Sequence, residues 1–157
     1  MNKNNNINIT ETIVYMINSL FPILCGIVFY GMFRPGTMIC IILKDYFHIV
    51  ITLPIETIIE LNKNVFINVL ICYLCDFLWA YSFAWSLLYV INKERVGRVY
   101  IFVICICSDI AVELLQRDGF FVGTYDSNDI VIQLIGTTLA FLLNAMLFRE
   151  GNRSWEV

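Results

Sequence analysis

Polar side chains with helical spacing stand in the most apolar part of the chain. Asp109, Glu113 and Gln116 occupy positions i, i+4 and i+7, which places them on one face of a helix. Asp129 and Gln133 repeat the first interval in the next apolar segment. Carboxylates serve as general acids and bases or bind cations, and polar groups are costly in lipid. These residues are therefore the candidate site.

Asp109 and Glu113 are costly in an apolar helix if they are ionised and unpaired. Four sources of compensation are open: protonation, an ion pair with Arg34 or Arg117, hydrogen bonds from the nearby glutamines, or a bound cation. The chemistry of the site depends on which of these the fold supplies.

The functional interpretation is a polar pocket between helices that opens toward one membrane face. Its expected lining is Asp76, Asp109, Glu113, Gln116, Arg117, Asp126, Asp129 and Gln133. The alternative is a buried polar network that only fixes helix packing. In the turn before the last apolar segment, Gly, Asp, Ser and Asn are common turn formers, and Asp129 can simply cap a helix.

Composition indicates an integral membrane protein. Of the 157 residues, 59% are hydrophobic and 15% are charged, and the mean hydropathy is +0.76, well above values typical of soluble domains. We predict an all-α, polytopic membrane helical bundle of about four transmembrane helices. A net charge of -3 with scattered Lys and Arg argues against a nucleic-acid partner.

Four apolar segments are long enough to cross a bilayer. The helices are expected at about 13–33, 75–92, 96–116 and 129–148, in a single domain of residues 13–148 between polar tails at 1–12 and 149–157. Neither apolar piece of segment 37–63 reaches spanning length, so an interfacial or re-entrant segment is expected there. Asp76 is expected at the N-terminus of the second span, where a carboxylate meets unpaired N–H groups.

The distribution of Lys and Arg predicts the orientation. With four spans, both termini and the 92–98 connection share one side and hold six basic residues, against four on the other side. Both termini are therefore expected in the cytoplasm. The acidic residues near the segment ends, Asp76, Glu113, Asp126 and Asp129, then lie toward the outer face.

Other reactive residue types give weaker signals. Cys72 and Cys75 lie in an apolar run and are expected to be packing residues, with a redox role as the alternative. His48, the only histidine, has no neighbouring nucleophile motif, and a catalytic base is the alternative there. We expect no metal or cofactor, since histidines do not cluster. Gly136 and Ala140 form a small-residue face suited to helix packing.

Two motifs in order carry a family resemblance. Glu113-x-x-Gln116 lies at one helix end, and Asp129-x-x-x-Gln133-x-x-Gly136 lies in the next helix. This pattern resembles the VanZ-like family of small bacterial multi-pass membrane proteins, in which Asn is usual at the position of Gln133.

The resemblance extends over about residues 76–145 and has two departures. Asp76 and the aromatic run after it are similar to an earlier helix of the family. Thr124 stands about where the family usually has Arg, and the basic residue often found ahead of the acidic helix start is missing.

The resemblance implies a protein of the bacterial plasma membrane that binds or excludes a lipid-linked or cell-wall ligand and affects susceptibility to the glycopeptide teicoplanin. Two alternatives stay open. One is a membrane enzyme acting on a lipid-linked substrate, with Glu113 or Asp109 as general acid or base and Arg34 or Arg117 holding an anionic group. The other is an accessory subunit of a membrane-protein partner.

Overall fold

The computed structural model describes residues 9–33, 38–50, 52–91, 97–120 and 125–148. All regular structure in these ranges is helical: α1 (Ile9–Phe33), α2 (Met38–Phe47), α3 (Ile55–Asn62), α4 (Val65–Ile91), α5 (Arg98–Arg117) and α6 (Ser127–Leu147). Helices α1, α4, α5 and α6 are each long and apolar enough to cross a membrane. The prediction of an all-α bundle with four spans is confirmed.

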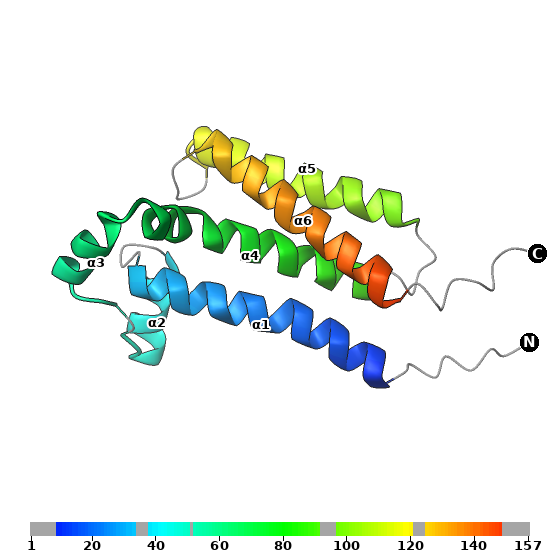
Figure 1. Ribbon diagram of the computed structural model, residues 1–157, viewed down its shortest axis with the longest axis horizontal. Coiled ribbons are helices and arrows are strands. Elements are labelled where there is room, and N and C mark those ends of the chain that lie inside the picture. Colours follow the sequence, from blue (N-terminus) through cyan, green and yellow to red (C-terminus); the bar gives the residue numbers. More distant parts are fainter. Residues whose placement is uncertain (1–8, 34–37, 51, 92–96, 121–124, 149–157) are drawn as a thin grey trace, which may run out of the picture.

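Helix α4 is the centre of the bundle (Figure 1). Helix α1 packs on one side of it and α6 on the other, while α5 packs against both α6 and α4. Successive long helices run in opposite directions, so α1 and α5 end where α4 and α6 begin. We call this the α2–α3 end, because the two short helices lie there. The first residue of α1 and the last residue of α6 lie at the opposite end.

A small-residue stripe on α6 lets α6 approach α4 closely. Gly136 lies so near α4 that a Cβ atom there would be 2.6 Å from the backbone oxygen of Phe77. Ala140, one turn further on, is fully buried, as is Ala84 on α4. The expectation that Gly136 and Ala140 serve helix packing is confirmed, since only small side chains permit this backbone approach.

Aromatic side chains fill the core toward the opposite end. Tyr15 of α1 stacks on Phe148 with ring centroids 5.0 Å apart, and it meets Trp85 of α4 edge-on at 5.3 Å. Trp85 is fully buried. These contacts hold α1, α4 and the end of α6 together.

The start of α4 corrects one prediction. Asp76 is neither an N-cap nor a first-turn residue, because α4 begins at Val65 and Asp76 lies in its interior. The helix of 27 residues is about 40 Å long at 1.5 Å per residue. It is longer than the ~30 Å needed to cross a hydrocarbon core.

Two other helix starts also differ from expectation. Helix α1 begins at Ile9, inside the expected polar tail of residues 1–12. Helix α6 begins at Ser127, and its N-cap is Asp126 rather than Asp129. The Asp126 carboxylate accepts the backbone N–H of Asn128 at 2.9 Å, which satisfies one of the free donors of the first turn. Residues 149–157, the expected C-terminal tail, lie outside the described residues.

Segment 37–63 forms two short helices, of 10 and 8 residues. Neither crosses a membrane, and Pro54 stands just before α3 as its N-cap. The backbone N–H of Leu53 donates to the carbonyl of Met32 at 3.1 Å, which ties the segment to the end of α1. An interfacial position for α2 and α3 stays a prediction.

Candidate functional site

The candidate site is built on a hydrogen bond between α5 and α6. Gln133 Nε2 donates to Glu113 Oε1 at 3.1 Å. Both side chains are buried, with exposed fractions of 1% for Glu113 and 7% for Gln133. Two residues 20 positions apart in the chain, each on a different helix, therefore meet inside the protein.

A second hydrogen bond lies one turn deeper along the same pair of helices. Thr137 Oγ1 donates to Asp109 Oδ2 at 3.2 Å. Thr137 is fully buried and Asp109 is half-buried. The two bonds form a ladder, because Asp109 and Glu113 are one turn apart on α5, as are Thr137 and Gln133 on α6. We call these four residues the α5–α6 polar cluster.

The cluster has more acceptors than donors. Glu113 Oε2 and Gln133 Oε1 are both buried without a hydrogen-bond partner. The donors directed to the two carboxylates are one amide and one hydroxyl, both neutral. A buried acceptor without a donor costs about 1 to 3 kcal/mol, so the cluster is suited to accept hydrogen bonds or to coordinate a cation.

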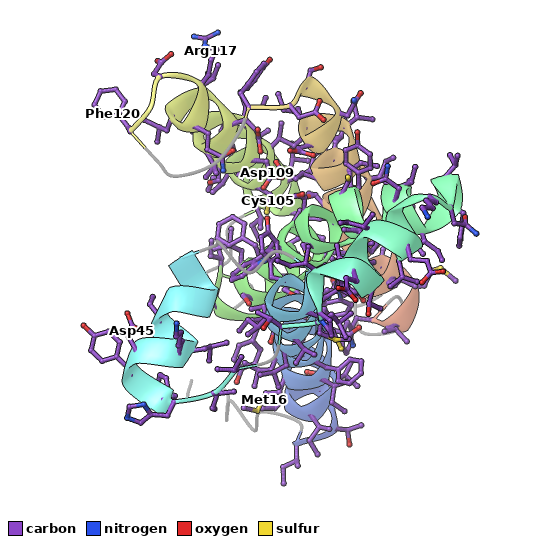
Figure 2. All side chains as sticks on the ribbon, turned by 90° about the vertical axis from the view of Figure 1, so that its left-hand side faces the viewer. Met16, Asp45, Cys105, Asp109, Arg117 and Phe120 are labelled. Atoms are coloured by element: carbon purple, nitrogen blue, oxygen red, sulfur yellow. The ribbon has the colours of Figure 1, made fainter. Side chains whose placement is uncertain are left out.

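Arg117 does not supply the missing positive charge. Its Nε atom pairs with Asp118 Oδ1 at 3.2 Å, with side-chain exposures of 56% and 53%. Figure 2 shows Arg117 pointing away from the bundle, whereas Asp109 lies within it. Of the four sources of compensation, the Arg117 ion pair is therefore directed to Asp118, because this adjacent residue offers a carboxylate without desolvation. Arg34, the other candidate, lies outside the described residues.

A separate polar group joins α4 to the start of α6. Tyr73 donates its hydroxyl to Asp126 Oδ2 at 3.3 Å, and Asn128 Nδ2 donates to the Tyr73 oxygen at 3.3 Å. Asn128 is exposed and Asp126 is half-buried. These three residues, which we call the Tyr73 group, form an accessible polar surface at the α2–α3 end.

The remaining predicted residues lie near these two groups in the chain. Gln116 is half-buried in the last turn of α5, and its backbone carbonyl accepts the N–H of Gly119 at 3.1 Å. Asp129 is half-buried in the first turn of α6. Asp76 is half-buried in the interior of α4. Of the predicted set, the structure thus brings Glu113 and Gln133 into direct contact.

Thr137 and Tyr73 were not predicted as site residues. Thr137 follows Gln133 by four positions, and this spacing is a signal that could have identified it. It was missed because the stripe contains Gly136 and Ala140, which indicate only packing. Tyr73 offers no such signal, since a tyrosine in an apolar helix is typical of a membrane interface.

Neutral polar residues also tie α1 to the bundle. Tyr81 of α4 donates its hydroxyl to Asn18 Oδ1 at 2.6 Å. Asn144 Nδ2 of α6 donates to the hydroxyl oxygen of Tyr15 at 3.0 Å. We call these four residues the α1 amide–tyrosine cluster. Each bond joins an uncharged donor to an uncharged acceptor.

The cysteines and His48 occupy other surroundings. The five cysteines whose side chains are described are free thiols, and Cys75 Sγ lies 3.7 Å from the backbone oxygen of Gly26 on α1. His48 follows α2 with a left-handed backbone, φ 54°, and lines an open surface hollow with Lys44, Asp45 and Val50. Among the described residues, no three or more His, Cys, Asp and Glu side chains gather as ligands for a metal ion.

Four long apolar helices packed into one bundle define the class: this is a multi-pass helical membrane protein. No family model matches the chain, and neither does a curated protein or a solved structure.

Proposed function

We propose that the chain is a VanZ-like protein of the bacterial cell envelope that binds or excludes a cell-wall ligand and thereby changes susceptibility to teicoplanin. One observation carries the proposal: Glu113 and Gln133, one from each half of the motif that resembles the family, bond directly at 3.1 Å. If the two halves of the motif serve one site, their polar residues are expected to lie in contact, and Glu113 and Gln133 do.

In the proposed orientation the α2–α3 end faces outward and both termini lie in the cytoplasm, as the Lys and Arg distribution predicts. A ligand from outside first meets the Tyr73 group, since Asn128 is exposed and Asp126 is half-buried. Glu113, at 1% exposure, holds α5 against α6 behind this surface. The groups that face the ligand are carboxylate, hydroxyl and amide, so the ligand supplies N–H and O–H groups.

The test is the teicoplanin susceptibility of a sensitive bacterium that expresses the chain, with membrane abundance measured by immunoblot. Wild type is expected to raise the inhibitory concentration several-fold, and Glu113→Gln is expected to abolish the increase at equal abundance. The matched control is Glu11→Gln, which makes the same change at an exposed position in the first turn of α1. An abundant wild type without effect would refute the proposal.

A second function, an accessory membrane subunit, is favoured by the burial of Glu113 and its bond to Gln133. In that case the cluster fixes packing only, and removal of one partner destabilises the fold. Glu113→Gln then lowers abundance, and a larger membrane protein copurifies with the wild-type chain. These two results together would separate this function from the first.

A further inference from the structure

The α5–α6 polar cluster has oxygen atoms that the protein itself leaves without donors. Glu113 Oε2 and Gln133 Oε1 belong to side chains that are more than nine-tenths buried, and neither atom has a partner. Glu113 Oε1 and Asp109 Oδ2 accept one neutral donor each. The site therefore presents several oxygens and a buried carboxylate, and no basic side chain of the described residues is bonded to them.

The basic side chains of the described residues are placed elsewhere. Arg117 pairs with Asp118 at the protein surface. Arg98 begins α5, about 22 Å along the helix from Glu113 at 1.5 Å per residue. Lys44 lies on α2, and Lys63 caps the C-terminus of α3. In the part of the chain that the structure describes, no ion pair compensates Glu113.

We propose that the cluster binds a monovalent metal cation of the size of sodium. The available ligands are Glu113 Oε2, Gln133 Oε1, the Asp109 carboxylate and the lone pairs of Thr137 Oγ1, whose proton is directed to Asp109. Carboxylate and carbonyl oxygens are the ligands that hard cations take in proteins, and sodium is a hard cation. The ion supplies a positive charge beside the carboxylates, and it is a partner for both unpaired acceptors, Glu113 Oε2 and Gln133 Oε1.

The charge and the number of ligands select a monovalent ion over calcium or magnesium. Calcium takes about six to eight oxygens, several of them from carboxylates, and magnesium requires near-octahedral geometry and retains several waters. Here only Glu113 is a fully buried carboxylate, since Asp109 is half-buried. A monovalent ion matches this one fully buried carboxylate.

Binding would also strengthen the contact between α5 and α6. Glu113 and Asp109 come from α5, and Gln133 and Thr137 come from α6, so the ion bridges the two helices. Any role of this bridge in glycopeptide susceptibility rests on the proposed function. Cation binding itself is measured on the purified protein without any glycopeptide, so the two proposals fail separately.

The experiment uses the full chain purified in detergent and dialysed into sodium-free choline chloride. Radioactive sodium binding is measured by equilibrium dialysis, and the Tm is followed by tryptophan fluorescence while NaCl replaces choline chloride at constant ionic strength. Saturable, stoichiometric binding and a saturable rise in Tm are expected. Glu113→Gln should abolish both, whereas Glu11→Gln should leave both unchanged.

Thr137→Val tests the site when Glu113→Gln does not fold, because it removes one oxygen at nearly constant volume. It should weaken sodium binding several-fold. The proposal is overturned if folded wild type binds no sodium. It is also overturned if Thr137→Val, and Glu113→Gln where that variant folds, bind sodium as tightly as wild type does. It is also overturned if Ca²⁺ or Mg²⁺ stabilises the protein at lower concentrations than Na⁺, or if the Tm follows pH and not sodium.

Discussion

The α5–α6 polar cluster and the α1 amide–tyrosine cluster each join helices through two hydrogen bonds, yet they differ in the charge of their bonded and unpaired groups. In the α1 cluster both bonds pair neutral groups. Nearby groups without partners, such as Ser82 Oγ and Trp85 Nε1, are neutral as well. In the α5–α6 cluster the unpaired atoms belong to a carboxylate and to the amide bonded to it. Burial and bonding alone are thus typical of packing, whereas uncompensated charge indicates a site.

The largest effect is expected from Gly136→Ala, which affects both clusters through α6. The new Cβ would lie 2.6 Å from the backbone oxygen of Phe77, so α6 must move away from α4. We expect a loss of about 1 to 3 kcal/mol in the free energy of unfolding. Denaturant unfolding in mixed micelles measures it.

Gly26→Ala is the control for this change. Its added Cβ would meet the Trp79 and Leu78 side chains at 3.7 and 3.9 Å, which are ordinary contacts. A loss in Gly26→Ala equal to that in Gly136→Ala would contradict the close approach of α6 to α4.

The next effect is expected from Asn144→Leu, which removes the donor to Tyr15. Interhelical hydrogen bonds of this kind contribute about 0.6 kcal/mol on average and up to about 1.7 kcal/mol. The coupling is measured by a double-mutant cycle with Tyr15→Phe. A coupling of zero would mean that the α1 cluster is held by its aromatic packing alone.

Glu113→Gln should behave differently from Asn144→Leu in sodium-free buffer. The substitution removes the uncompensated carboxylate charge. The new amide offers N–H donors to Gln133 Oε1, which has no partner in the wild type. The free energy of unfolding should stay the same or rise by about 1 kcal/mol. A loss as large as that of Asn144→Leu, measured under the same conditions, would assign both clusters to packing.

The smallest effect is expected from Arg117→Gln. Its ion pair with Asp118 is more than half exposed on both sides, and such pairs contribute about 0 to 1 kcal/mol. Stability and sodium binding should both remain close to wild type. A clear loss of sodium binding would instead show that Arg117 acts on the cluster.

Hydropathy predicted the four spans because each apolar run matches the length of a bilayer crossing. It did not predict where α4 begins. An isolated acid in an apolar run is typical of a helix start, but Asp76 lies inside the helix. The burial of Cys75 and Ile71 before Asp76 shows the reason. Tertiary contacts extend the ordered helix beyond the position that capping favours.

The candidate site was predicted in part. Helical spacing identified Glu113 and Gln133, because both lie on the polar stripe of an apolar helix. Spacing cannot give the rotation of α5 against α6, which decides that Glu113 meets Gln133 while Asp109 meets Thr137. Nor does it show that Arg117 pairs with its neighbour in the chain.

The hydrogen bonds at the two ends of α6 have a consequence for how the protein fits bilayers of different thickness. Tyr73 of α4 bonds to the cap residue Asp126 at the start of α6, and Tyr15 of α1 accepts from Asn144 near its end. Helix α6 therefore cannot slide along its neighbours to match a thinner or thicker membrane. Because α5 is also bonded to α6, we expect hydrophobic mismatch to be met by a common tilt of the whole bundle.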